Sequence, residues 1–177
     1  THINIVTDTI NNLYQRMELY ELDLAVVEGA LPGGRFHSVL LDTDYLCLIV
    51  APNHPFARRG SITLEELKGE NLILRTRQAG TRKLFDNYLT SISDSIRNFH
   101  VILEMDNLNT IRELVSSGLG VSVISHSACR DAIQAGTLAE VPIQDFRLVR
   151  EVNMVHNQDF SHPELLEELR RIYLTNE

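Results

Sequence analysis

Short apolar runs alternate with segments of helical periodicity along this chain of 177 residues. Residues 10–17 show the helical pattern, because their apolar side chains recur at i, i+3, i+4 and i+7. Runs of strand length cover residues 3–7, 22–27, 46–51, 71–75, 99–105, 121–125 and 148–156. This alternation predicts an α/β fold, and the first two runs with the helix between them predict a parallel βαβ unit.

Capping residues mark where several of the predicted helices begin and end. Thr63 with Glu66, and Ser161 with Glu164, have the spacing of capping boxes, so helices are expected to follow them. Gly118 follows a helical pattern that Asn107 can cap, and it is expected to end that helix in a left-handed conformation. A further helix is expected from about residue 81.

The order of the elements predicts two α/β lobes, the second inserted into the first. Lobe I is expected to comprise residues 1–51 and 148–177, and lobe II residues 52–147. Ligands of such folds bind at the carboxyl ends of parallel strands, here expected between the lobes. Because residues 3–7 already resemble a buried strand, the chain is expected to begin inside a domain.

Composition restricts the class of partner. Hydrophobic residues make up 44% and charged residues 23% of the chain, as in ordinary globular proteins. The formal net charge of −8 disfavours binding of a phosphate backbone by this segment. No apolar run has the roughly 20 residues that span a membrane. We therefore expect a cytoplasmic protein that contacts no membrane, with Cys47 and Cys129 as buried thiols.

Three arginines surround a glycine where the helix near residue 81 is expected to begin. Arg75 ends an apolar run, Gly80 permits close approach of a ligand, and Thr81 and Arg82 add a hydroxyl and a forked cation. The free N–H groups of a helix N-terminus favour anions, so these residues suggest an anion site. In the alternative interpretation, the arginines pair with surface acids such as Glu70 and Asp86, and the glycine only makes a turn.

Other candidate chemistry is weak. The polar residues 7–9 join the first apolar run to the first helix, where a threonine hydroxyl could contact a ligand or only cap the helix. Gly118 and Gly120 follow a helix and precede a strand, the reverse of a dinucleotide-binding motif. Residues 125–127 lack a nucleophile elbow, and the seven histidines lack a metal-binding spacing. We expect neither a catalytic site nor a cofactor.

Four segments together resemble the effector-binding domain of LysR-type transcriptional regulators. They are residues 21–29 (ELDLAVVEG), 50–75, 79–85 (AGTRKLF) and 111–125 (IRELVSSGLGVSVIS). The resemblance implies a periplasmic-binding-protein-like (type 2) fold of two lobes, truncated at the N-terminus by one strand–helix unit. It further implies a small inducer, held between the lobes, and a winged helix-turn-helix outside this chain that binds DNA.

The resemblance also implies which residues bind the inducer and how the chains assemble. The implied ligand-binding residues are Thr7, Thr9, Arg75, Gly80, Thr81, Arg82, Val121 and Ser122. Family members form homodimers, and tetramers at full length. A peroxide-sensing role is not expected, because Cys47 is placed in lobe I and Cys129 stands alone. The alternatives are a solute-binding protein of a transport system and an enzyme that uses the same cleft.

Overall fold

A computed structural model describes residues 4–28 and 35–175 and divides the chain into two compact units. Unit 1 comprises residues 1–43 and 150–177, and unit 2 comprises residues 44–149. The first division falls inside strand β2 (Phe36–Val50), and the second follows the first residue of β7 (Val149–Asn157). These positions differ from the predicted crossings after residue 51 and before residue 148, so residues 44–51 belong to unit 2.

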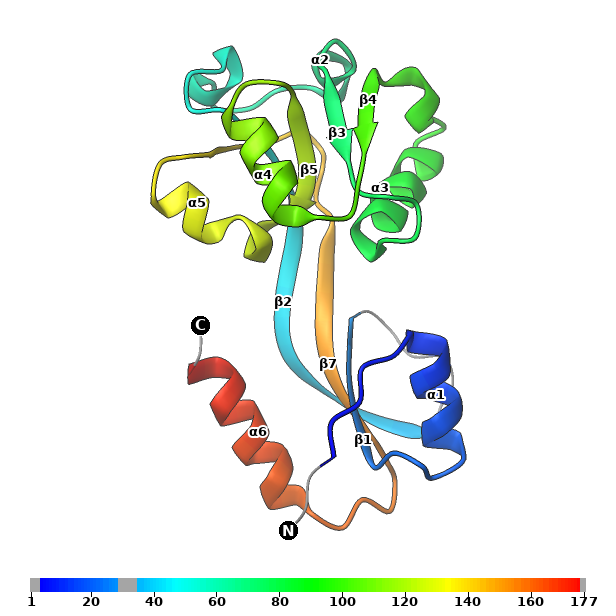
Figure 1. The fold of residues 1–177 in the computed structure, drawn as a ribbon. Coiled ribbons are helices and arrows are strands. Elements are labelled where there is room, and N and C mark those ends of the chain that lie inside the picture. The colour runs from blue at the N-terminus through cyan, green and yellow to red at the C-terminus, as the bar shows by residue number, and fades with distance from the viewer. Residues whose placement is uncertain (1–3, 29–34, 176–177) are drawn as a thin grey trace. The chain divides into compact units, whose positions relative to one another are not determined.

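Unit 1 is built around the antiparallel pair of β1 (Leu24–Glu28) and β7 (Figure 1). Helix α1 (Ile10–Glu18) precedes β1, and α6 (Pro163–Thr175) follows β7. Met17 of α1 is buried in one apolar cluster with the inward-facing residues of the two strands. The members of that cluster are Met17, Ala25, Val27 and Val155. The amphipathic pattern of residues 10–17 therefore predicted a helix that the structure contains.

The predicted strand at residues 3–7 is not found among the described residues of that segment. Residues 4–9 have no regular secondary structure, and the side chain of Ile5 is 86% exposed. A strand requires a neighbour that accepts and donates its backbone hydrogen bonds. In unit 1, β1 pairs with β7 in antiparallel register, Leu24 opposite His156, so the predicted parallel βαβ unit was wrong.

Unit 2 contains a mixed sheet in the order β6-β2-β5-β3-β4. Its shorter strands are β3 (Leu72–Leu74), β4 (Val101–Glu104), β5 (Val121–Ser125) and β6 (Ala139–Val141). Strand β3 is parallel to both neighbours, whereas β2 is antiparallel to β5 and β6. The carboxyl ends of β3 and β4 therefore point the same way, which places the loops after them at one edge of the sheet.

Helices cover both faces of this sheet, as Figure 1 shows. Along β2, Leu48 faces a cluster with α2 (Leu64–Lys68) and α3 (Gly80–Ser91), while Ile49 faces one with α4 (Leu108–Ser116) and α5 (Arg130–Gln134). Side chains of a strand alternate between faces, so continuous apolar runs fit a sheet buried on both sides. The predicted α/β class is confirmed.

Most predicted helix boundaries in unit 2 agree with the structure. Thr63 and Glu66 form the capping box of α2, and Asn107 accepts a hydrogen bond from the backbone of α4. Gly118 has φ 82°, the left-handed conformation expected after α4. In unit 1, helix α6 begins at Pro163, later than a cap at Ser161 would place it, because proline favours the first helical position. Unit 2 also contains three short 3-10 helices, which are Pro55–Arg58 (η1), Ile96–Asn98 (η2) and His126–Ala128 (η3).

A partly buried ion pair stabilises the segment after α3 and gives a pH-dependent prediction. Lys68 lies 2.8 Å from the carboxylate of Asp94 and, with Asn98 and the backbone of Ser95, lowers the pKa of that carboxyl to about 2. The ionised form is favoured in the folded chain, so its stabilisation is present above the ordinary value of 3.8 and lost as pH falls towards 2. We expect Asp94→Asn to cost about 1–2 kcal/mol at pH 7. In urea unfolding, the difference from wild type should shrink between pH 5 and about 3; a constant difference would contradict this assignment.

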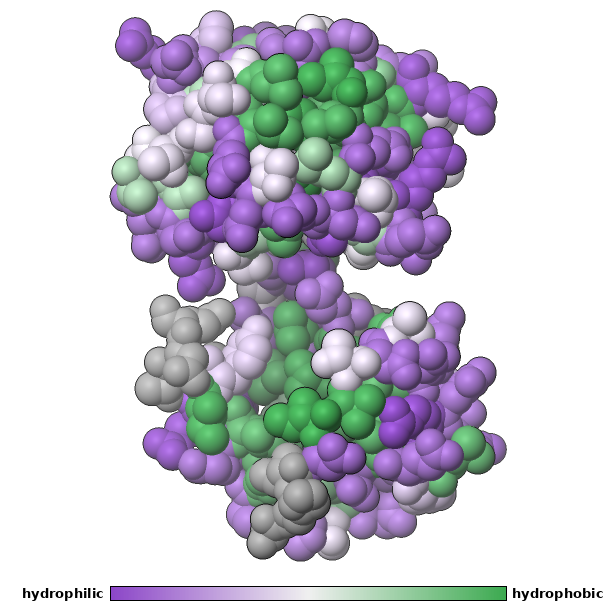
Figure 2. Space-filling model, viewed as in Figure 1, coloured by the Kyte–Doolittle hydropathy of each residue, from purple (hydrophilic) through white to green (hydrophobic). Residues whose placement is uncertain are grey.

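Figure 2 shows a hydrophobic area on unit 2 over the region of β3, β4 and α4, and further hydrophobic residues are visible on unit 1. Exposed apolar side chains of unit 2 include Ile102 on β4 and Leu119 after α4. Among the helices that the structure describes, none combines the length and hydrophobicity that crossing a membrane requires.

Candidate functional site

The N-terminus of α3 carries backbone donors that no side chain caps. Ala79 occupies the N-cap position and provides no side-chain acceptor, and the first turn contains no acidic residue. The first N–H groups of a helix lack partners within the helix and carry partial positive charge. At Gly80 and Thr81 these groups therefore favour an external acceptor, and an anion fits best.

Thr81 adds a polar group at the same helix end. Its side chain is only 4% exposed, and its Oγ1 is a buried atom without a hydrogen-bond partner in the described part of the chain. Burying a hydroxyl without a partner costs on the order of 1–3 kcal/mol. A ligand oxygen that accepts from this hydroxyl would remove that cost.

Arg75 follows β3 directly and lies beside this helix end through the loop of residues 76–79. One terminal nitrogen of its guanidinium lies 3.6 Å from Asp106 Oδ1, while its Nε is buried without a hydrogen-bond partner among the described residues. Thr76 Oγ1 donates to the same Asp106 oxygen at 2.7 Å. The Arg75 cation is therefore loosely paired and retains a donor for another acceptor.

Arg82 has a different environment from the other predicted ligands. Its side chain is 1% exposed, and its Nε donates to both carboxylate oxygens of Asp86, at 2.9 and 3.0 Å. One terminal nitrogen donates to the backbone oxygen of Arg75 and lies 3.1 Å from the carboxylate of Glu104. Arg82 thus holds the first turn of α3 against the ends of β3 and β4. The interpretation in which it pairs with Asp86 describes its contacts in the structure.

Val121 and Ser122 lie inside unit 2. Both are fully buried, and the Val121 N–H donates to the backbone oxygen of Asn71 at 2.8 Å. The Ser122 Oγ has no hydrogen-bond partner in the described structure. Their side chains therefore contribute to the interior of unit 2, and neither is at its surface.

Thr7 and Thr9 belong to unit 1 and are exposed. Thr9 is the N-cap of α1, where its hydroxyl oxygen accepts from the Asn12 N–H at 3.4 Å. The Asp8 carboxylate accepts from the Thr9 N–H and the Asn12 side chain, both at 2.7 Å. Helix capping, one of the two roles considered from the sequence, is thus the role that Thr9 has in the structure.

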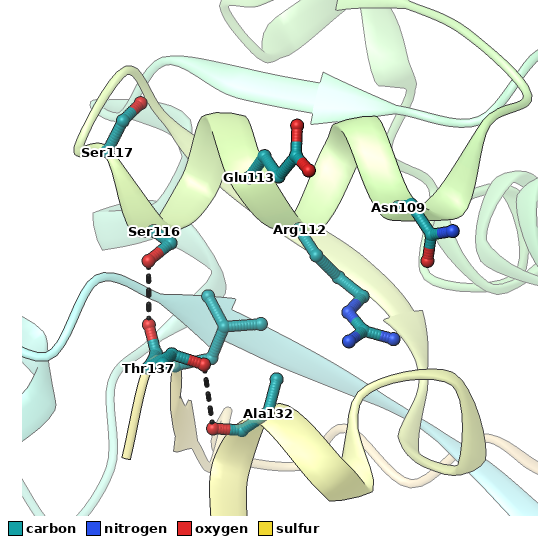
Figure 3. A pocket seen from close by; sticks show the side chains of 8 residues that line it. Asn109, Arg112, Glu113, Ser116, Ser117, Ala132 and Thr137 are labelled. Carbon is teal, nitrogen blue, oxygen red and sulfur yellow. Dashed lines mark hydrogen bonds between the residues drawn. The ribbon is translucent and has the colours of Figure 1, made fainter. Parts of the chain in front are cut away.

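Two cavities lie within unit 2, and neither is lined by a predicted ligand-binding residue. The larger, of about 520 Å³, lies between α4 and α5 (Figure 3). There, Arg112 is paired with Asp131 at 3.0 Å, and Ser116 Oγ donates to the Thr137 backbone oxygen at 3.0 Å. The smaller, of about 310 Å³, is lined by residues of β2, β6 and the segment before β7, among them Tyr45, Cys47 and Glu140.

The two cysteines meet in unit 2, so the expectation that they lie apart was wrong. Their sulfur atoms are 3.7 Å apart, although the residues are separated by 82 positions. Strand β2 is antiparallel to β5, with Cys47 opposite Ile124, and η3 then brings Cys129 back over Cys47. A ring nitrogen of His126 and both sulfur atoms lie within 4.8 Å of one another. The spacing His126-x-x-Cys129 was the sequence signal for this cluster, and a search for paired histidines missed it.

Comparisons with known proteins agree with this architecture. An uncharacterized HTH-type transcriptional regulator of Methanocaldococcus jannaschii is 33% identical over 141 residues, which are 80% of this chain and 47% of that protein. The chain thus spans about half the length of the curated relatives it matches.

Solved structures share the fold at lower sequence identity. The regulatory domain of Synechocystis PCC6803 CcmR in complex with 2-PG has a TM-score of 0.74 at 21% identity, covering 92% of this chain and 78% of that one. The effector-binding domain of QuiR in complex with shikimate has a TM-score of 0.64 at 18% identity, covering 86% of this chain and 70% of that one. The family description "LysR substrate binding domain" matches residues 1–176. The chain belongs to the LysR substrate binding domain family, with the periplasmic-binding-protein-like fold of that family.

Proposed function

We propose that this chain is the effector-sensing part of a transcriptional regulator and that it binds a small anion at the N-terminus of α3. The observation that carries the site is the uncapped helix end with the buried, unpartnered hydroxyl of Thr81. Backbone N–H groups of Gly80 and Thr81, the Thr81 hydroxyl and the Arg75 Nε would supply donors to one anionic group.

Arg82 has a positioning role in this proposal. Its two carboxylate partners already balance its charge, so it offers little attraction for a further anion. By fixing the first turn of α3 to Arg75, it holds the backbone donors in place before the ligand arrives. Such preorganisation lowers the entropy lost on binding.

The names and ligands of similar proteins support a regulatory role over transport or catalysis. The curated relatives are called HTH-type transcriptional regulators, and two structural neighbours were solved with 2-PG and shikimate. Shikimate is a carboxylate, which suits donors of the kind found at α3. We therefore propose that binding alters a DNA-binding segment outside this chain and that the chain catalyses no reaction.

A homodimer is also proposed, as family members assemble this way. The hydrophobic area that Figure 2 shows on unit 2 supports such a contact, because soluble monomers rarely expose large apolar areas. Sedimentation equilibrium of the wild-type chain tests this: a monomer at all concentrations would contradict it.

Thr81→Val is expected to weaken anion binding about tenfold, because it removes one donor to a charged group and preserves side-chain shape. The measurement is a thermal-shift titration with inorganic phosphate, sulfate and small carboxylates including shikimate, each compared with a neutral amide or alcohol. Thr90→Val is the matched control, since Thr90 is exposed on the last turn of the same helix.

Anions should raise the melting temperature of wild type and of Thr90→Val, and raise that of Thr81→Val only at higher concentration. If the neutral compounds raised the melting temperature as much as the anions do, the proposal that the effector is an anion would be wrong. If Thr81→Val bound anions with the affinity of wild type, the proposal that the anion binds at the N-terminus of α3 would be wrong.

A further inference from the structure

We propose that Cys47, His126 and Cys129 form a binding site for a thiophilic divalent cation with the coordination chemistry of zinc. The site is distinct from the anion site at α3, because it lies on the other face of the sheet, in the cluster covered by α4 and α5. Both cysteines are buried and His126 is partly exposed, so the three side chains form an interior cluster that solvent can reach at the histidine.

The three proposed ligands come from two neighbouring segments of unit 2, strand β2 and the turn of η3. Cys47 lies on β2 opposite Ile124, and the next residues along β5 lead directly into η3. Residues 126 and 129 are three positions apart on this single turn, which places both side chains on the same side as Cys47. A rigid sheet and a short turn are a suitable scaffold, since ligands held on regular elements need little rearrangement.

The distance between the sulfur atoms fits tetrahedral coordination. With zinc–sulfur bonds of about 2.3 Å and a tetrahedral angle, two thiolates on one zinc ion lie about 3.8 Å apart. The Cys47 and Cys129 sulfur atoms are 3.7 Å apart, farther than the roughly 2.05 Å of a disulfide. The imidazole nitrogen lies within 4.8 Å of both, so a side-chain adjustment of about 1 Å brings it to coordination distance.

Charge balance favours a divalent ion at this position. Cys47 and Cys129 are both buried within an apolar cluster, where an isolated charge is costly. A divalent cation would displace one proton from each thiol and form two metal–sulfur bonds, and the resulting M²⁺(S⁻)₂ group again has no net charge. Two isolated thiolates would be costly in the same environment, which also makes these thiols weak nucleophiles towards oxidants.

Second-layer contacts orient the imidazole as they do in metal sites. The Glu140 carboxylate lies 3.0 Å from His126 Nδ1, and the Tyr45 hydroxyl lies 2.9 Å from the same nitrogen. The Tyr45 ring stacks on the imidazole with centroids 4.7 Å apart. A carboxylate on the second nitrogen raises the basicity of a ligating histidine and fixes its ring orientation.

The smaller cavity adjoins the proposed site, because its lining includes Tyr45, Cys47 and Glu140. Three protein ligands leave one tetrahedral position for water or another small ligand. The proposed site therefore has three ligands and a set of contacts that orient the imidazole.

Cobalt titration tests the proposal, since Co²⁺ takes the same ligands as zinc and reports thiolate bonds through a charge-transfer absorption in the near ultraviolet. The chain is reduced, freed of metal with a chelator and kept anaerobic. We expect one Co²⁺ per chain, displacement by Zn²⁺, and release of two protons measured in weakly buffered solution.

Variants separate this site from adventitious binding. Cys47→Ser and Cys129→Ser should each weaken Co²⁺ binding by at least about 100-fold, and Glu140→Gln by about 10-fold, as second-layer changes do. His162→Gln is the matched control, because His162 is exposed in unit 1 and should leave binding unchanged. Circular dichroism of each metal-free variant verifies folding, and Cys47→Ala provides a second thiol deletion should Cys129→Ser fail to fold.

Four results would overturn the proposal, three of them from the cobalt titration. These are the absence of a charge-transfer band, a band that persists in folded Cys47→Ser and Cys47→Ala, and binding that His162→Gln abolishes. Loss of free thiols through a Cys47–Cys129 disulfide in air, with no metal bound under anaerobic conditions, would also overturn it. None of these results depends on anion binding at α3, so the two proposals fail independently.

Discussion

Arg82→Ala is expected to lower the free energy of unfolding of unit 2 by about 3 kcal/mol. The guanidinium is almost fully buried and connects α3 to the carboxylates of Asp86 and Glu104. Removing the cation leaves both carboxylates next to a cavity without their partner, and it also removes the donor to the Arg75 backbone oxygen. The two carboxylates are about a third exposed, at 35% and 37%, which keeps the cost at the lower end of the range for buried ion pairs.

Urea unfolding followed by circular dichroism measures this effect against two comparison variants. Arg77→Ala changes an exposed arginine of the same loop and should alter stability by less than about 0.5 kcal/mol. Arg82→Lys keeps the charge but loses the planar fork that contacts three acceptors, so an intermediate loss is expected. Equal stability of Arg82→Ala and Arg77→Ala would show that the buried network contributes nothing.

This prediction changes what reduced anion binding by an Arg82 variant would mean. A distorted first turn of α3 would move the donors of Gly80 and Thr81 and weaken binding without any direct contact from Arg82. Thr81→Val separates the two effects, because it removes a donor and leaves the ion pairs intact. The combination of a stable fold and weaker binding in Thr81→Val is therefore the sharper test of the site.

The sequence predicted elements well where local signals and burial agree. The strands of unit 2 are short apolar runs because helices cover both faces of the sheet, and residues such as Thr63 and Asn107 mark the helices between them. The first part of β2 was missed, because residues 36–45 mix exposed polar and apolar side chains and lack a continuous apolar run. The apolar residues at 3–7 gave the opposite error, since apolar character alone supplies no partner strand.

The candidate sites were less predictable, because each depends on contacts between distant parts of the chain. The arginine-rich loop was recognisable from its composition and the helix after it, but the buried role of Arg82 depends on Glu104 from β4. The pairing of Cys47 with Cys129 depends on the register of β2 against β5, which no local pattern encodes. The residue types in the sequence therefore indicated the N-terminus of α3 as a candidate site. The Cys47–Cys129 pair could not be predicted in this way, because it depends on the register of the strands.

Gly120→Ala is expected to destabilise unit 2 by about 3 kcal/mol through overpacking. A Cβ atom at Gly120 would lie 2.5 Å from the backbone oxygen of Asn71. That oxygen also accepts from the Val121 N–H at 2.8 Å, where β5 begins beside β3. Backbone atoms in a sheet cannot rotate away as a side chain can, so relief of the clash requires β5 to shift and weakens this hydrogen bond.

Gly60→Ala is the matched control, because a Cβ at Gly60 meets no atom within 4 Å. We expect it to be neutral or slightly stabilising in the same urea experiment, since alanine restricts the unfolded chain more than glycine does. Gly118, two residues before Gly120, has φ 82°, so a substitution there would test backbone strain instead of close packing. If Gly120→Ala were as stable as Gly60→Ala, β3 and β5 would have to separate at this point at little cost. In that case, the close approach of the Asn71 backbone oxygen would not be the reason why glycine occupies position 120.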